Sequence, residues 1–163
     1  MRWKVAILTA SDRGSRGERE DTSAQVIREL VEEDMNGEIV EYRIVADEMN
    51  EIKAALIEMT EYYQADLILT TGGTGLAARD VTPEATLQVV DRLAPGFVEA
   101  MRAKSMLKTP HAMLSRAVAG IRGRTLIINL PGSPKGVHEN LAVILGVLPH
   151  ALGILTGREG DHK

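Results

Sequence analysis

The chain has 163 residues and a mass of 17.7 kDa; 44% of its residues are hydrophobic and 26% are charged. This size is enough to build the core of one globular domain, so we expect residues 1–163 to form a single domain. The formal net charge of −4 argues against a general nucleic-acid-binding protein, because such proteins carry a basic surface that replaces the counterions of the phosphates.

The absence of cysteine excludes disulfide bonds and metal sites built on thiolates. The longest apolar stretch, residues 141–155, is interrupted by glycine, proline and histidine and is too short to span a bilayer. No charged segment followed by an apolar one precedes the first predicted strand. We therefore expect a cytoplasmic protein without a membrane partner.

The first half of the chain alternates between strand and helix patterns. Strands are predicted at residues 3–10, 38–45 and 66–71. Helices with apolar residues at helical spacing are predicted at 23–31 and 51–63, the second of them capped by Asn50. This alternation is typical of a parallel sheet with right-handed crossovers.

The second half adds helices and one more strand. We expect helices at 82–92 and 96–107, a strand at 124–130 and a long terminal helix from about Pro134. The whole pattern predicts a three-layer α/β fold, with a mostly parallel sheet and helices on both faces. Ligands of such sheets bind outside the carboxyl ends of the strands, so loops 11–21, 46–50, 72–82 and 131–136 should share one edge.

The most distinctive loop follows the predicted strand 66–71 and contains Gly72, Gly73 and Gly75. Glycines adopt backbone angles closed to other residues and let peptide N–H groups approach a ligand. Thr82 is predicted to cap the next helix and Pro83 to be its first residue, so the positive end of that helix faces the same region. The loop indicates a phosphate or carboxylate site, with an ordinary glycine turn as the alternative.

Two common nucleotide motifs fit poorly. Residues 73–78 match the loose G-x-G-x-x-A dinucleotide pattern, but the predicted helix begins several residues later than that pattern requires. The P-loop pattern G-x-x-x-x-G-K-[ST] is absent from the sequence. A nicotinamide cofactor and a P-loop ATPase are therefore disfavoured.

The polar side chains of the four loops complement one another. Asp80 lies between the glycines and the predicted helix, where a carboxylate can hold a divalent cation on a phosphate. The other loops supply hydroxyls, carboxylates and cations, namely Ser11, Asp12, Arg13, Arg16, Arg19, Asp47, Glu48, Ser133 and Lys135. Alternatively, Asp12 caps a turn and the arginines form a solvated face. The four histidines lack ligand-like spacing, so none is assigned to catalysis.

A set of motifs, in a fixed order, spans nearly the whole chain: 11–13 (Ser-Asp-Arg), 70–75 (Thr-Thr-Gly-Gly-Thr-Gly), 79–86, 95–97, 114–116 and 130–135 (Leu-Pro-Gly-Ser-Pro-Lys). Together they resemble the MogA/MoaB family of molybdenum-cofactor biosynthesis proteins. The resemblance implies a trimeric or hexameric molybdopterin-binding α/β protein. It also implies transfer of AMP from MgATP to the terminal phosphate of molybdopterin, release of pyrophosphate, and hand-over of the product to the molybdenum-insertion enzyme.

The resemblance also assigns site residues. The family's two functional aspartates correspond to Asp47 and Asp80, which would be catalytic and would hold Mg²⁺. The pterin and the nucleotide would bind along the loops, at Ser11, Asp12, Arg13, Thr71, Gly72, Gly73, Thr74, Gly75, Thr82, Pro131, Gly132, Ser133 and Lys135. No general base is required, because the attacking phosphate oxygen is already anionic; the reaction needs positioning and neutralised charge.

Two alternatives remain. Family members on the MoaB side that have lost the Asp-Val-Thr-Pro signature suggest a pterin-binding assembly protein without turnover, but this chain retains the signature at residues 80–83. Longer proteins with the same glycine loop act on nucleotide pyrophosphates, and the short length of this chain argues against that activity.

Overall fold

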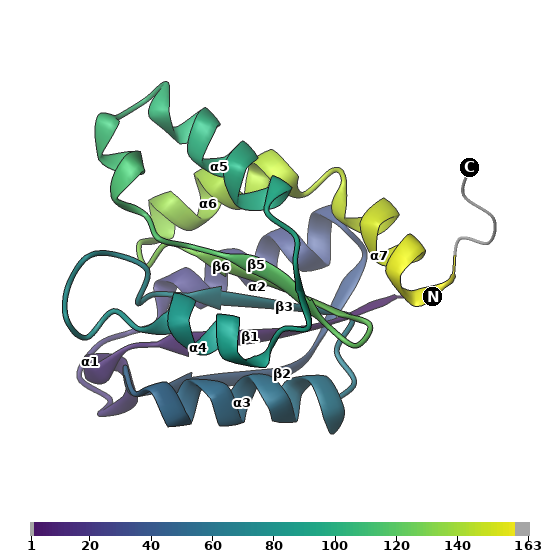
Figure 1. Ribbon diagram of the computed structural model, residues 1–163, viewed down its shortest axis with the longest axis horizontal. Coiled ribbons are helices and arrows are strands. Elements are labelled where there is room, and N and C mark those ends of the chain that lie inside the picture. The colour runs from purple at the N-terminus through teal and green to yellow at the C-terminus, as the bar shows by residue number, and fades with distance from the viewer. Residues whose placement is uncertain (1, 159–163) are drawn as a thin grey trace.

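A computed structural model describes residues 2–158, in which one six-stranded sheet has the order β2-β1-β3-β6-β5-β4 (Figure 1). The strands are β1 (Trp3–Ala10), β2 (Gly37–Val45), β3 (Leu67–Thr71), β4 (Arg92–Leu93), β5 (Ala119–Arg122) and β6 (Thr125–Leu130). Strands β2, β1, β3 and β6 are parallel, whereas β5 runs antiparallel to both of its neighbours. The predicted, mostly parallel sheet is confirmed.

Helices cover both faces of the sheet (Figure 1). One face carries α2 (Thr22–Asp34), α5 (Gly96–Met106), α6 (Pro134–Ile144) and α7 (Leu148–Thr156), and the other carries α3 (Met49–Glu61) and α4 (Thr82–Val89). A short α1 (Asp12–Ser15) follows β1, and a 3₁₀ helix, η1 (Pro110–Leu114), follows α5. The three-layer α/β arrangement is as predicted.

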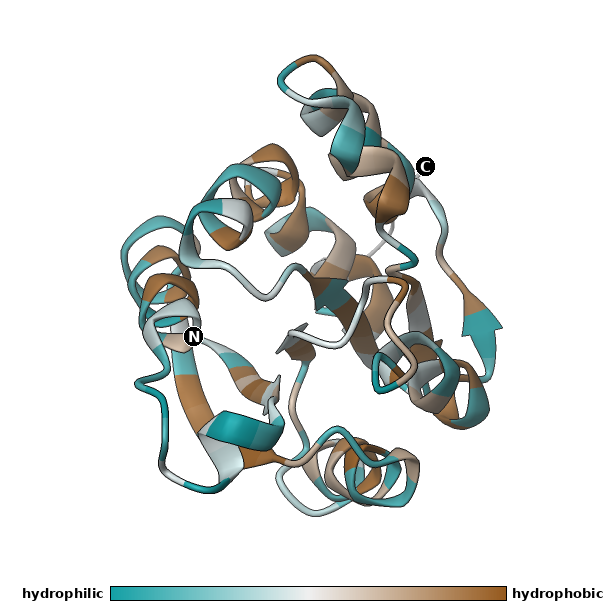
Figure 2. Cartoon of the chain, turned by 90° about the vertical axis from the view of Figure 1, so that its left-hand side faces the viewer, coloured by the Kyte–Doolittle hydropathy of each residue, from teal (hydrophilic) through white to brown (hydrophobic). Residues whose placement is uncertain are grey.

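Two cores lie on the two faces of the sheet. Successive residues of a strand point to opposite faces, so Ile7 and Ile128 enter one core while Ala6 and Ile127 enter the other. Strands β3 and β6 are buried along their whole length, as expected for strands covered on both faces. Figure 2 shows hydrophobic and hydrophilic residues mixed along the helices, and the buried hydrophobic residues of the helices belong to these two cores.

The long terminal helix predicted from Pro134 is wrong. The chain forms α6 and α7, which meet at a bend of 65°. Gly146 lies at the break and weakens the helix, and Pro149 is favourable only in the first turn of a new one. Within residues 2–158, no single helix is long and apolar enough to cross a membrane, and α6 and α7 pass that test only when joined.

Two predicted helix caps are also wrong. Helix α3 begins at Met49, before Asn50, and its flanking residue Glu48 makes no side-chain cap bond. Helix α4 begins at Thr82 itself, after Val81. The sequence patterns did not reveal β4 and β5, because both strands are short and β4 is exposed.

Candidate functional site

The four predicted loops meet at one edge of the sheet, beyond the carboxyl ends of its parallel strands and near α1 (Figure 1). They enclose a cavity of about 310 Å³. The predicted site residues that line it are Ser11, Arg19, Asp47, Thr71, Gly72, Gly73, Asp80, Gly132 and Ser133. The two aspartates therefore face the same cavity as the glycine loop and the start of α6.

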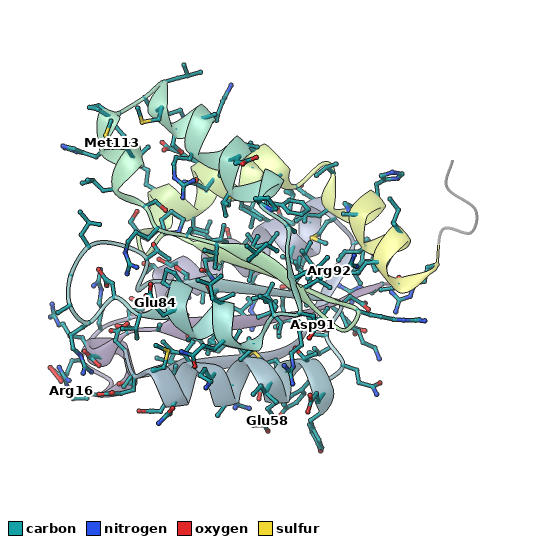
Figure 3. All side chains as sticks on the ribbon, viewed as in Figure 1. Arg16, Glu58, Glu84, Asp91, Arg92 and Met113 are labelled. Atoms are coloured by element: carbon teal, nitrogen blue, oxygen red, sulfur yellow. The ribbon has the colours of Figure 1, made fainter. Side chains whose placement is uncertain are left out.

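Other predicted binding residues do not line this cavity. Arg13 and Lys135 are exposed, and Arg16, labelled in Figure 3, is exposed and paired with Glu18. The cavity lining also lacks Asp12, Thr74, Gly75, Thr82 and Pro131. Pro131 lines a second cavity of about 300 Å³ that is bordered by α5, η1 and α6 and shares Ser133 with the first.

Asp12 and Asp47 support each other across two loops. The backbone N–H of Asp12 donates to Asp47 Oδ2 and the backbone N–H of Asp47 donates to Asp12 Oδ1, both at 3.0 Å. Arg79 also donates to both oxygens of Asp12, at 3.0 and 2.8 Å, and to Glu48 at 2.9 Å. The Arg79 guanidinium lowers the pKa of Asp12. This carboxylate is therefore ionised, and the positive charge of Arg79 balances its negative charge.

Asp47 presents one oxygen that the protein leaves unpaired. Its Oδ1 is buried and has no hydrogen-bond partner. Burial raises the pKa of Asp47, although the hydrogen bond from Asp12 opposes the shift. A buried carboxylate oxygen without a donor is costly unless a cation or a donor from a ligand reaches it.

Gly73 makes room for Asp47. Its φ is +69°, in the left-handed region, and a Cβ at this position would lie 2.4 Å from Thr82 Oγ1 and 3.2 Å from Asp47 Oδ1. Thr82 is fully buried and its hydroxyl also lacks a partner, so it supports the loop from inside instead of capping α4. The unpaired oxygens of Asp47 and Thr82 therefore both lie next to the backbone of Gly73.

Asp80 is anchored within its own loop. Its Oδ2 accepts the backbone N–H of Ala77 at 3.0 Å, and a Cβ at Gly75 would come within 2.9 Å of the same oxygen. Glycine at position 75 thus lets the loop fold against this carboxylate.

Side chains and backbone groups join the loops into one wall. Thr71 donates to the carbonyl of Pro131 at 2.5 Å, and Ser23 donates to that of Gly132 at 2.8 Å. Ser133 caps α6 by accepting the N–H of Gly136 at 3.0 Å. Ser133 also lines the cavity, so the positive end of the α6 dipole lies beside it.

The sequence patterns did not single out Asp21, which also lines the cavity. It caps α2 and accepts hydrogen bonds from Thr9 at 2.6 Å and from the hydroxyl of Tyr42. Burial, followed by the bond to Asp21, raises the pKa of Tyr42. The position of Asp21 just before the predicted helix 23–31 was the available signal, because aspartate is a preferred N-cap residue.

Within residues 2–158, no three histidine, aspartate or glutamate side chains gather in a metal-binding group. Asp47 and Asp80 nevertheless suit a cation that arrives with a phosphate. Mg²⁺ commonly uses one or two carboxylates together with substrate phosphates and water. The unpaired Asp47 Oδ1 has the chemistry of such a ligand atom.

The fold and this edge define an open-sheet α/β protein with a glycine-loop site suited to phosphate. The family described as a probable molybdopterin binding domain matches residues 6–150, and the chain belongs to this family. The resemblance noted in the sequence is thereby confirmed.

Individual relatives agree with this membership. A molybdopterin adenylyltransferase of Helicobacter pylori (strain J99) is 46% identical over 154 residues, which cover 94% of this chain and 88% of the relative. The molybdopterin biosynthesis enzyme MoaB from Thermus thermophilus is 54% identical, with a TM-score of 0.90 and coverage of 95% and 97%. The molybdopterin biosynthesis Mog protein from Mycobacterium ulcerans is 39% identical, with a TM-score of 0.88 and coverage of 96% and 99%.

Proposed function

We propose that this protein is a molybdopterin adenylyltransferase that uses MgATP. An oxygen of the terminal phosphate of molybdopterin attacks the α-phosphorus of ATP, a new P–O bond forms, and the bond to the leaving pyrophosphate breaks. The products are adenylyl-molybdopterin and pyrophosphate. The observation that carries the proposal is the buried, unpaired Asp47 Oδ1 in a cavity that Asp80 also lines.

The residues of this chain act by positioning and electrostatics. Asp47 and Asp80 hold the divalent cation, which supplies positive charge to the phosphates. The backbone of the glycine loop and the positive end of the α6 dipole hold phosphate oxygens, with Ser11, Thr71 and Ser133 as neighbouring hydroxyls. Such preorganised donors require little movement when charge develops on the leaving group.

The first test is to incubate the purified protein with molybdopterin and MgATP and to measure adenylyl-molybdopterin and pyrophosphate. Wild-type protein is expected to form both products, and Asp80→Asn is expected to form neither at a comparable rate. Tight pterin binding without product in either protein would leave a non-catalytic binding protein as the function. Hydrolysis of ADP-ribose as the sole substrate would instead indicate a nucleotide pyrophosphatase.

We also propose the setting in which this activity operates. The chain acts as one domain in a homotrimer or homohexamer in the cytoplasm and passes its product to the molybdenum-insertion enzyme. Membership of the molybdopterin-binding family supports this proposal. Light scattering of the eluting protein during size-exclusion chromatography measures the oligomeric state, and a monomer at micromolar concentration would contradict it.

A further inference from the structure

Arg116 joins the loop that carries Asp80 to the segment between η1 and β5. It follows η1 and precedes β5, and its guanidinium reaches across to the loop and to α4. Its Nε donates to the carbonyl of Gly75 at 2.7 Å and its Nη2 donates to the carbonyl of Asp80 at 2.6 Å. One side chain therefore holds the loop both before and at Asp80.

A third contact extends this attachment to α4. Arg116 Nη1 donates to Glu84 Oε2 at 2.6 Å, and the Arg116 guanidinium lowers the pKa of the Glu84 carboxyl. Glu84 is labelled on α4 in Figure 3. The backbone N–H of Arg116 also donates to the carbonyl of Thr74 at 2.8 Å. The loop is thus fixed at its start, at Asp80 and just after it.

The segment that carries Arg116 is itself anchored. Arg102, on α5, donates to the carbonyl of Ser115 at 3.0 Å and to that of Ala117 at 3.4 Å. The backbone on either side of Arg116 is therefore held in place by Arg102. A guanidinium presents its donors in a rigid planar fork, and hydrogen bonds from a charged donor are stronger than neutral ones.

The loop has few other attachments of this strength. Its residues 76–79 are exposed, and the Arg79 side chain that binds Asp12 and Glu48 is 54% exposed. Solvent screens ion pairs of that kind, so they contribute little. Arg116 is half-buried, and two of its three side-chain acceptors are main-chain carbonyls of the loop itself.

We propose that Arg116 is a positioning residue that holds the Asp80 carboxylate at the distance from Asp47 at which both meet the cation brought with ATP. This inference rests on the proposed function, because it assumes that Asp80 contacts that cation. A lysine at position 116 supplies one charge but not the fork, so it cannot replace all three bonds.

The test measures binding, not turnover. Calorimetry with α,β-methylene-ATP, which cannot release pyrophosphate, is performed with Mg²⁺ and with EDTA. The ratio of the two affinities isolates the contribution of the cation. We expect Arg116→Ala to reduce this ratio at least about tenfold, as loss of a group that orients a metal ligand commonly does, while the affinity in EDTA stays within about twofold. A purely structural role would weaken both affinities alike.

Arg43→Ala is the matched control. Arg43 also binds two acceptors, Glu41 and Glu58, and its side chain is 28% exposed, but it lies outside the cavity. This variant should keep the wild-type affinity ratio. If Arg116→Ala does not fold, as judged by its thermal unfolding, Arg116→Lys decides. A loss of at least about threefold in the ratio supports the proposal, and a wild-type ratio overturns it.

Asp80→Asn separates this inference from the proposed function. If Asp80→Asn loses the Mg²⁺-dependent gain in affinity and Arg116→Ala keeps it, the role of Arg116 is overturned alone. If Asp80→Asn keeps the gain, the cation does not meet Asp80, and both the assigned role of Asp80 and this inference fall.

Discussion

Asp12 and Asp47 each donate a backbone N–H to the other's carboxylate, at 3.0 Å in both directions. The two acids nevertheless differ in their surroundings. Asp12 is paired with Arg79, which lowers its pKa, whereas burial raises the pKa of Asp47. Asp12, whose charge is balanced by Arg79, thus supports the backbone of Asp47. Asp47 keeps one carboxylate oxygen without a hydrogen-bond partner, and this oxygen is free to meet a ligand.

Asp47→Asn should stabilise the free protein at neutral pH. The pKa of Asp47 is raised in the folded state above 3.8, so its charge opposes folding as the pH rises through the folded pKa, and asparagine carries no such charge. The gain at pH 7 should stay below about 1 kcal/mol, because solvent screens this partly exposed group. Urea unfolding at pH 7 and pH 4 measures it. This prediction fails if Asp47→Asn gains no stability at pH 7 or gains more stability at pH 4 than at pH 7.

Asp12→Ala should lower the proposed Mg²⁺-dependent activity by about 10- to 100-fold, because the backbone N–H of Asp47 loses its acceptor and Arg79 keeps only its bond to Glu48. Initial rates over a range of Mg²⁺ concentrations test this. Glu18→Ala is the control, since Glu18 also pairs with an arginine but is exposed and outside the cavity. Equal rates for the two variants would contradict the supporting role of Asp12.

Gly73→Ala should destabilise the protein more than Gly17→Ala. Both glycines have a similar positive φ, +69° and +73°, but a Cβ at Gly17 meets nothing within 4 Å, whereas one at Gly73 lies 2.4 Å from Thr82 Oγ1. Backbone strain costs about 1 kcal/mol at either position, and overpacking should add about 1–3 kcal/mol at Gly73. Chemical unfolding compares them, and equal losses would show that the loop relaxes around the methyl group.

Asn129→Ala should cost about 2–4 kcal/mol in the free energy of unfolding, because several buried hydrogen bonds are lost at once. Asn129 is fully buried; its Nδ2 donates to Thr70 and Thr86 at 3.0 and 3.1 Å, and its Oδ1 accepts the N–H of Val118 at 3.1 Å. Asn50→Ala, at an exposed position of α3, should change the stability by less than about 0.5 kcal/mol. A similar loss in both variants would rule out the buried network as the cause.

The sequence predicted those parts of the fold that depend on local periodicity. β1 and β3 have continuous apolar runs, and the parallel order of the strands follows from the alternation of strand and helix patterns. The meeting of Asp47 with Asp80 followed from the rule that loops at the carboxyl ends of strands share an edge.

Features that depend on distant contacts were not predictable in this way. Thr82 has the composition of a cap, but the burial of its hydroxyl is decided by packing against the glycine loop. Arg116 contacts Gly75, which is 41 positions away, through a side chain whose direction no local pattern specifies. The break between α6 and α7, in contrast, coincides with local signals in the sequence, Gly146 and Pro149, which the prediction of one long helix overlooked.

Ser115 and Ala117 line the second cavity, while Arg116 between them reaches the loop of the first. Adjacent residues of one segment thus serve two neighbouring cavities: two line the second cavity, and the one between them holds a loop of the first. A single-residue insertion or deletion here would exchange the two walls and turn the guanidinium away from Asp80. We expect this stretch to tolerate changes of side chain far better than changes of length.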